Sequence, residues 1–381
     1  MTTRSSFKYN EYDLICFSHL RWDFVFQRPQ HLLTRFAKNR RVFFIEEPIF
    51  GEEGPRLEVS ERENGLRLVV PHLPQGIDVD AVMPELVSQL AADQHIDECV
   101  LWFYTPMMLS WADALKPKAI VYDCMDELSM FKGAPTQLLD REAELFKRAD
   151  LVFTGGQSLY EAKRDKHSAV YAFPSSIDVT HFETALSITE EPDDQRTIPH
   201  PRIGYCGVID ERCDIELLAK IADLRPDWHY VMIGPVVKID ERDLPHRDNI
   251  HYLGGKNYND LPAYIGGWDV AMMPFALNDS TRFISPTKTP EYLAAGRPVV
   301  STPIRDVVRP YGDMGLVLIA STPEEFVCAI ETAMNDDIDA RRANAREFLS
   351  TMSWDKTQSE MERLIDEVLI GAAAGSSVAH A

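Results

Sequence analysis

A cation and a carboxylate stand three residues apart at the predicted start of a short helix in the C-terminal half of the chain. The segment 285–302 is typical of a loop, a short helix, a glycine and a buried strand. Thr289 is expected to cap this helix and Gly296 to end it. A helix start carries unpaired backbone N–H groups and favours negative charge. With Lys288 and Glu291 beside it, the segment suits a nucleotide diphosphate, whose ribose can donate hydrogen bonds to the carboxylate.

The simpler interpretation of the same pattern is a solvated lysine and a glutamate that complements the helix dipole. A family resemblance favours the binding site. The run PTKTPEYLAAGRPVVST (286–302) resembles the donor-site segment of the GT-B glycosyltransferases of family 1, or group 1. In that family the glutamate before this helix binds the ribose of a nucleotide sugar. The resemblance therefore implies that role for Glu291 and a diphosphate-facing role for Lys288.

The resemblance covers nearly the whole chain. The segments that resemble family members, in order, are PSSIDVTHF (174–182), IGYCGVIDERCDIELLAKIA (203–222) and SWDKTQSEMERLI (353–365). The run HLRWDFVFQRPQHLLTRFA (19–37) is similar to a bacterial subgroup that makes cell-surface polysaccharide or teichuronic acid. The resemblance implies an α/β GT-B fold, with two Rossmann-like domains facing across a cleft and a C-terminal helix that crosses back to the first domain. It also implies an EC 2.4 enzyme that moves a sugar from a nucleotide-diphosphate donor, most commonly UDP-linked, to a glycan or lipid-linked acceptor.

Two positions depart from the family pattern. Phe283 stands eight residues before Glu291, where many retaining members carry a second glutamate. Val208 follows Gly207, where arginine is common, so that Arg212 is the remaining cation of that loop. The expected donor-binding residues are Lys288, Glu291, Arg212, Arg282, Thr287 and Gly207.

The bulk composition is that of a soluble globular protein. The 381 residues predict two domains, and their content is 45% hydrophobic and 26% charged. Neither a membrane-spanning run nor a secretory h-region is visible, and the six cysteines form no CxxC pair. A reduced, cytoplasmic protein with buried thiols is expected, with peripheral contact at the inner face of the plasma membrane left open.

The net charge of −21 repels nucleic acid and anionic lipid, and it repels a nucleotide sugar as well. A donor site must therefore build a local positive pocket. The sequence shows no HExxH, His/Cys cluster or DxD between a strand and a loop, so neither a metal nor another cofactor is expected.

Strand and helix signals alternate in two series, which favours two parallel sheets flanked by helices. The polar, acidic stretch between the series reads as a linker. The predicted parts are an N-terminal acceptor-side domain at 1–185, a linker at 186–200, a donor-binding domain at 201–352, a crossover helix at 353–370 and a disordered tail at 371–381.

A transfer to a hydroxyl requires a group that accepts its proton. Asp126 is the first candidate for this base, because it sits just after the strand-like run AIVYDC, where α/β sheets place functional groups. Asp123 and Glu127 stay open as alternatives, and Asp126 as a plain helix cap is the structural alternative. Asp23 is the second catalytic candidate.

The segment 18–30 follows the first strand and is expected to line the cleft. His19 and Arg28 are the acceptor-side candidates. The alternative is that Arg28 and Asp23 form a structural ion pair.

Two further functions remain open at this point. One is a non-catalytic relative that binds a nucleotide sugar, which the phenylalanine at position 283 allows. The other is a nucleotide-sugar epimerase or hydrolase on the same fold.

Overall fold

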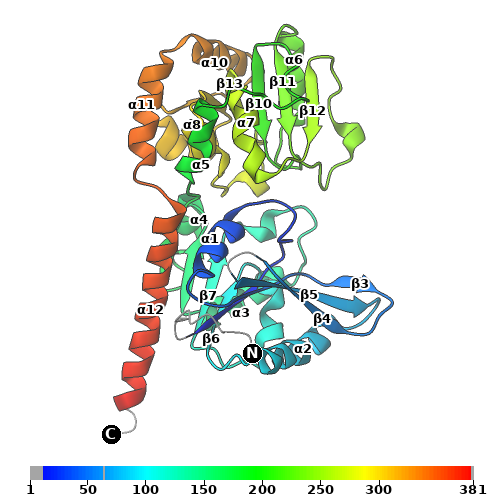
Figure 1. Ribbon diagram of the computed structural model, residues 1–381, viewed down its shortest axis with the longest axis vertical. Coiled ribbons are helices and arrows are strands. Elements are labelled where there is room, and N and C mark those ends of the chain that lie inside the picture. The colour runs from blue at the N-terminus through cyan, green and yellow to red at the C-terminus, as the bar shows by residue number, and fades with distance from the viewer. Residues whose placement is uncertain (1–11, 63–64, 379–381) are drawn as a thin grey trace, which may run out of the picture.

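The computed structural model describes residues 12–62 and 65–378, and side chains up to residue 372. The described chain forms two α/β domains, stacked one above the other in Figure 1. The first sheet has nine strands, in the order β3-β5-β2-β1-β6-β7-β8-β9, with β4 paired to β5. The second has six, in the order β12-β11-β10-β13-β14-β15. Every named pairing is parallel except β4 with β5, which confirms the two parallel sheets predicted from the alternating pattern and the α/β fold that the resemblance implies.

The predicted strand runs of the first half became its buried central strands. These strands and the following edge strand are β1 (Asp13–Phe17), β2 (Val42–Ile45), β6 (Cys99–Phe103), β7 (Ala119–Cys124), β8 (Leu151–Thr154) and β9 (Val170–Ala172). The helices that cover this sheet are α1 (Arg28–Phe36), α2 (Val79–Asp93), α3 (Leu138–Arg148) and α4 (Gln157–Lys163). Their apolar sides and the strands form two core clusters, one on each face of the sheet.

Three strands between residues 49 and 74 were not predicted. They are β3 (Ile49–Gly51), β4 (Arg56–Glu61) and β5 (Leu66–Pro74), and they project from the side of the first domain (Figure 1). All three residues of β3 are exposed, and none in β4 is buried, so neither carries the apolar run that marks a buried strand. Pairing with β5 decides their conformation, and this pairing is invisible in the local pattern.

The second domain follows the predicted series closely. Its strands are β10 (Arg202–Cys206), β11 (His229–Ile233), β12 (Ile250–Gly254), β13 (Val270–Met273), β14 (Val299–Ser301) and β15 (Val317–Ile319). Its helices, with the one that leads into it, are α5 (Val179–Glu183), α6 (Ile215–Leu224), α7 (Leu261–Gly266), α8 (Lys288–Ala294), α9 (Arg305–Val307), α10 (Pro323–Asn335) and α11 (Ile338–Leu349).

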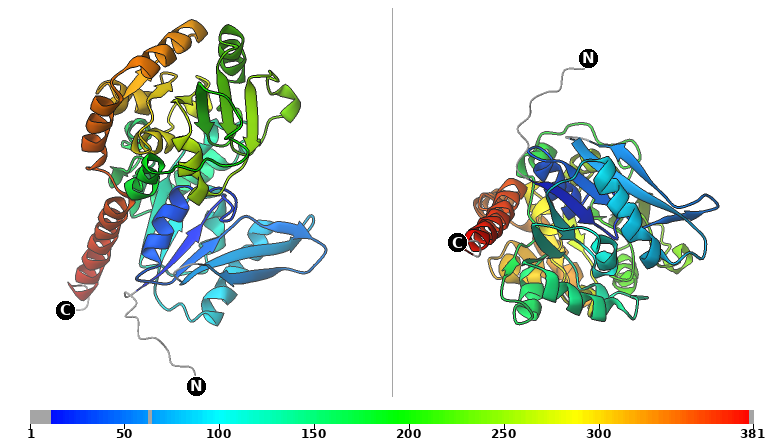
Figure 2. Two further views of the ribbon diagram at one scale, coloured as in Figure 1. Left: turned by 45° about the horizontal axis from the view of Figure 1, so that its top comes forward. Right: turned by 90° about the horizontal axis from the view of Figure 1, so that it is seen from below.

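The last helix, α12 (Trp354–Val378), leaves the second domain and runs along the first (Figures 1 and 2). Met361, Leu364 and Ile365 are buried in a core cluster of the first domain, so the crossover is built as expected. The helix does not stop at 370. It continues through residues 371–378 of the segment predicted to be disordered, where three consecutive alanines favour helix. Residues 379–381 lie outside the described residues.

Contacts between the domains surround the gap between the sheets. Ser175 Oγ donates a 2.6 Å hydrogen bond to the carbonyl oxygen of Ser285. The backbone N–H of Ser158, in the first turn of α4, donates to the carboxylate of Asp306, with a 3.0 Å distance to Oδ1. On another side of the gap, the rings of Phe26 and Tyr258 stack with centroids 4.4 Å apart. These contacts hold the two domains together, with the carboxyl ends of their sheets on opposite sides of the gap.

The packing of α12 can be tested with two isoleucines on that helix. Ile365 is 0% exposed and Ile370 is 70% exposed. Ile365→Ala should lower the free energy of unfolding of the first domain by about 2–5 kcal/mol, because it leaves a cavity in the core. Ile370→Ala should change it by less than about 0.5 kcal/mol. Urea denaturation of both variants checks this, and equal losses would show that α12 does not depend on this buried face.

Candidate functional site

The segment with Lys288 and Glu291 forms the short helix that the sequence predicted, with a different start. The helix begins at Lys288, and Thr287 occupies the capping position without a side-chain hydrogen bond. Thr289 was expected as the cap. It lies inside the helix instead, because the helix already starts at Lys288, and its hydroxyl contacts Met273 Sδ at 3.5 Å. Gly296 has φ +70°, a conformation that ends a helix and favours glycine, as predicted.

Lys288 and Glu291 form an ion pair. Lys288 Nζ lies 2.6 Å from Glu291 Oε2, and their side chains are 18% and 5% exposed. Burial alone would lower the pKa of Lys288, but the Glu291 carboxylate outweighs it and raises that pKa. Burial raises the pKa of Glu291, and the Lys288 ammonium opposes this. The structure therefore brings both predicted donor residues together. A ligand can contact either side chain only if their ion pair opens or if the ligand shares it.

A cavity of about 1130 Å³ lies between the two domains, next to this pair. The first domain lines it with the segment after β1, which includes Trp22–Arg28, and with Met125 and Asp126 after β7. The second domain lines it with loops that follow β10, β11, β12 and β13. These loops all leave the carboxyl ends of parallel strands, where α/β sheets bind ligands.

Each cation that lines the cavity already has a carboxylate partner. The pairs are Lys288–Glu291 at 2.6 Å, Arg212–Asp210 at 2.7 Å, Lys256–Asp194 at 2.7 Å, Arg28–Asp123 at 2.9 Å and Arg62–Asp23 at 2.7 Å. The local positive pocket that the net charge led us to expect is therefore not formed by free cations, because a carboxylate pairs with each cation in the lining.

Asp126 differs from the other two carboxylates of its segment. Asp123 is fully buried in a bidentate pair with Arg28, and Glu127 pairs with Lys163 at 2.7 Å. Asp126 lines the cavity, and its carboxylate makes no hydrogen bond to another described residue. Burial raises the pKa of Asp126, although the guanidinium groups of Arg212 and Arg28 oppose this. A carboxylate with a raised pKa and open lone pairs is suited to accept a proton from a substrate.

The acceptor-side candidates lie in different places. Arg28 is 3% exposed, and besides Asp123 it donates to the carbonyl oxygen of Phe173 at 2.7 Å. Asp123 and the carbonyl group of Phe173 therefore fix the position of Arg28 in the cavity wall. Asp23 is exposed and pairs with Arg62, so the alternative Asp23–Arg28 pair is wrong; the fold gives each a different partner. Asp23 does line the cavity, on the side of the first domain.

His19 is not among the residues that line the cavity. Burial, followed by the ammonium of Lys238, lowers the pKa of His19 to about 4. Its Nδ1 is buried without a hydrogen-bond partner among the described residues. His19 is therefore neutral at pH 7.

Of the remaining donor candidates, some line the cavity and one does not. Gly207 and Thr287 line the cavity, as does Arg212. Gly234 allows the loop after β11 to approach Gly207 closely, because a Cβ added at Gly234 would lie 1.8 Å from the carbonyl oxygen of Gly207. Arg282 is exposed and outside the cavity lining, with its guanidinium 5.3 Å from the ring centroid of Phe283. Phe283 itself packs against a core cluster of the first domain.

Sequence reasoning missed an interdomain aromatic group on the wall of the cavity. The rings of Phe26 and His181 each stack on the ring of Tyr258, with centroids 4.4 Å from the Tyr258 centroid. His31 stacks on Trp354 at 4.6 Å and also contacts Tyr258 edge-on. Aromatic residues in loops after strands were the available signal, but their partners come from segments far apart in the chain.

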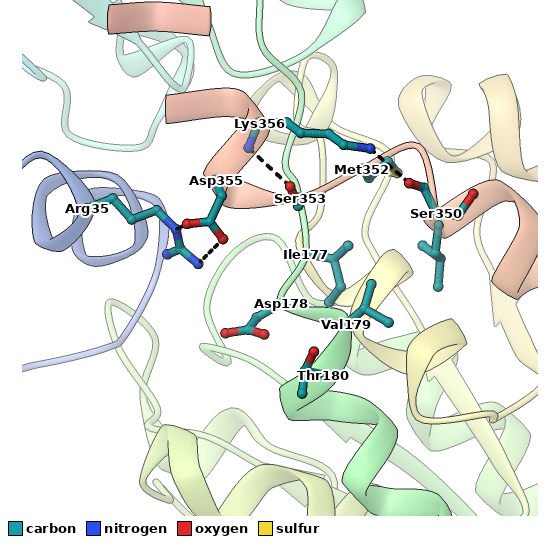
Figure 3. A pocket seen from close by; sticks show the side chains of 11 residues that line it. Arg35, Ile177, Asp178, Val179, Thr180, Ser350, Met352, Ser353, Asp355 and Lys356 are labelled. Atoms are coloured by element: carbon teal, nitrogen blue, oxygen red, sulfur yellow. Dashed lines mark hydrogen bonds and ion pairs between the residues drawn. The ribbon is translucent and has the colours of Figure 1, made fainter. Parts of the chain in front are cut away.

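A second cavity, of about 300 Å³, lies where α12 begins (Figure 3). Arg35 pairs there with Asp355 at 3.0 Å, and Lys356 Nζ donates to the carbonyl oxygen of Ser350 at 2.9 Å. Asp178 accepts from the backbone N–H of His181. Because Arg35 of α1 pairs here with Asp355 of α12, and Asp178 caps α5 beside them, this cavity belongs to the connection between the domains.

No group of three or more His, Cys, Asp or Glu side chains in the described part of the chain is placed to hold a metal ion. None of the helices described is both long and apolar enough to cross a membrane.

Comparison with known proteins agrees with this geometry. Residues 200–336, most of the second domain, match the family described as glycosyl transferases group 1. The Bacillus subtilis protein TuaH, named for a glycosyltransferase of teichuronic acid biosynthesis, is 22% identical over 295 residues. This alignment covers 71% of this chain and 72% of that protein.

Solved structures share the fold across nearly the whole chain. An E. coli trehalose-6-phosphate structure bound with UDP-2-fluoro glucose has a TM-score of 0.69 at 13% identity, covering 94% of this chain and 99% of that one. Anabaena HepE in complex with UDP and glucose has a TM-score of 0.65 at 12% identity, covering 93% and 100%. WaaG, a glycosyltransferase involved in lipopolysaccharide biosynthesis, has a TM-score of 0.61 at 14% identity, covering 92% and 98%. The match of the second domain, the relative that spans both domains and the shared fold together support a GT-B glycosyltransferase of group 1.

Proposed function

We propose that this enzyme transfers a sugar from a UDP-sugar to a hydroxyl group of a glycan or lipid-linked acceptor. One observation carries the proposal. The interdomain cavity is lined on the second domain by Lys288, which pairs with the buried Glu291 behind it, and on the first domain by the unpaired carboxylate of Asp126. The UDP bound in two structures of the same fold supports the choice of nucleotide. The teichuronic acid pathway named for TuaH supports a glycan acceptor.

In the proposed reaction the acceptor oxygen forms a bond to the anomeric carbon of the donor sugar. The bond from that carbon to the β-phosphate oxygen breaks, and UDP leaves with the electron pair. The hydroxyl proton goes to the carboxylate of Asp126. Glu291 accepts hydrogen bonds from the ribose, while Lys288 and Arg212 face the diphosphate. The cavity of about 1130 Å³ has room for a nucleotide sugar and part of an acceptor.

We place this reaction in the cytoplasm, where nucleotide sugars are supplied, with peripheral contact at the inner face of the plasma membrane when the acceptor is lipid-linked. Fractionation of cells that express the tagged full-length chain tests this placement. Recovery in a periplasmic or secreted fraction would overturn it.

The ribose role of Glu291 predicts a specific loss. Glu291→Gln keeps the shape but removes the charge, so the dissociation constant for UDP should rise about 10- to 100-fold, the effect of one charged hydrogen bond. Isothermal titration calorimetry measures it. Glu324→Gln, at an exposed position of α10, is the matched control and should bind like wild type. Unchanged UDP affinity in folded Glu291→Gln would remove the donor site from α8.

The role of Asp126 as base predicts the opposite pattern. Asp126→Asn should lower kcat about 100-fold or more, the usual contribution of general-base catalysis, while the UDP dissociation constant changes less than about threefold. Asp140→Asn, an exposed carboxylate of α3, is the control. In the wild type, kcat should fall as the pH drops through the raised pKa of Asp126, because the protonated carboxyl cannot accept a proton. Survival of that acidic limb in Asp126→Asn would assign the base elsewhere.

We further propose that the transfer needs no divalent cation, with the paired lysines and arginines of the cavity facing the diphosphate instead. Initial rates measured with excess EDTA should equal those of untreated enzyme within about twofold. A loss of activity that added Mg²⁺ or Mn²⁺ restores would contradict this. UDP release without any acceptor, at the rate seen with acceptor, would instead identify a nucleotide-sugar hydrolase.

A further inference from the structure

The charge balance of the cavity leaves a diphosphate poorly neutralised. Seven carboxylates either line the cavity or pair with its five cations: Asp23, Asp123, Asp126, Asp194, Asp210, Asp260 and Glu291. These groups carry more negative than positive charge before any ligand binds. A diphosphate adds further negative charge, so a cation from outside this set has to contribute.

Lys238 is such a cation, outside the cavity lining but four residues after Gly234, which lines it. It lies in the loop after β11, which also supplies Gly234 and Pro235 to the cavity wall. Its side chain is exposed, and among the described residues it has no carboxylate within ion-pair distance. Its ammonium is therefore free to pair with a ligand, unlike the five cations that line the cavity.

The ammonium of Lys238 is directed toward the other domain. Its Nζ lies 5.0 Å from the ring centroid of Phe131, in the segment that follows Asp126. The guanidinium of Arg212 lies 5.5 Å from the centroid of the same ring. Arg212 lines the cavity, so Lys238 and a cavity-lining residue of the loop that follows β10 contact the same ring. An exposed cation over a ring is weakly held and can move to a stronger anionic partner.

Two further observations agree with this placement. The ammonium of Lys238 acts on two groups of the first domain. It contributes to lowering the pKa of His19, and it opposes the rise that burial causes in the pKa of Asp126. The backbone of Lys238 has φ +64°, which is uncommon for a residue with a side chain. Such strained positions gather at ligand-binding loops, where the surrounding structure holds them.

We propose that Lys238 binds the diphosphate of the donor and stabilises UDP as it leaves. Without a ligand the ammonium rests over Phe131 and beside Arg212. With a donor bound it leaves the ring and donates N–H hydrogen bonds to the phosphate oxygens. When the bond between the anomeric carbon and the β-phosphate oxygen breaks, the electron pair moves to that oxygen, and Lys238 keeps its proton. This role rests on the proposed UDP-sugar donor.

The test compares UDP with UMP, which lacks the β-phosphate. Full-length wild type, Lys238→Ala and Lys238→Arg are titrated with each nucleotide by calorimetry, and kcat is measured with the donor sugar. Lys238→Ala should weaken UDP binding about tenfold and UMP binding less than about threefold, and it should lower kcat. Lys238→Arg should restore most of the UDP affinity. Lys220→Ala, which removes an exposed lysine of α6 that pairs with Glu216, controls for net charge and should match wild type.

The outcomes separate the two proposals. Wild type that binds neither nucleotide overturns the UDP-sugar donor and this role of Lys238 together. Wild type that binds UDP, alongside Lys238→Ala with the same UDP affinity and kcat, overturns only the role of Lys238. An unchanged UDP affinity with a raised KM for the acceptor also overturns it, since Lys238 would then contact the acceptor. Equal weakening by Lys220→Ala would reduce the effect to bulk charge. A thermal melt of each variant confirms that it is folded.

Discussion

The carboxyl ends of two parallel sheets face one gap, and the other functional features depend on this arrangement. In a parallel sheet each strand ends at the same edge, so the loops that follow the strands gather there. Asp126 follows β7, Gly207 follows β10, and Lys288 comes after β13. Only the opposed sheets bring these three positions to one cavity. The crossing of α12 onto the first domain and the Ser175–Ser285 hydrogen bond hold that opposition.

Charge is the second constraint. A chain with a net charge of −21 must bind an anionic donor, and it surrounds the donor cavity with ion pairs. Burying a pair costs desolvation energy that the mutual attraction only partly offsets, so these pairs contribute more to geometry than to stability. The pairing orients Lys288 and Arg212 toward the cavity while keeping their charges from repelling each other. It also explains why a free cation at the rim, Lys238, gains importance.

Three acidic residues of one segment illustrate how environment assigns roles. Asp123 is buried near the carboxyl end of β7 and pairs with Arg28, and Glu127 pairs with Lys163. Asp126, between them, faces the cavity with its lone pairs open. Residues with the same side-chain chemistry thus become a structural anchor, a partner of the buried Lys163 and a base candidate. The difference comes from the backbone direction after β7, and from which partner each carboxylate reaches.

The sequence by itself determined the α/β class, most of the strands and the short helix at Lys288, because apolar periodicity and a terminal glycine are local signals. It also singled out Asp126 and Glu291 by their positions after a strand and at a helix start. Partners were decided by the tertiary structure. The link of Arg28 to Asp123 spans 95 residues, and the stack of Phe26 on Tyr258 joins two domains. The exposed strands β3 and β4 form through pairing with β5 rather than through their own pattern. Side-chain contacts between distant segments depend on how the two sheets pack, and no local pattern of residues encodes that packing.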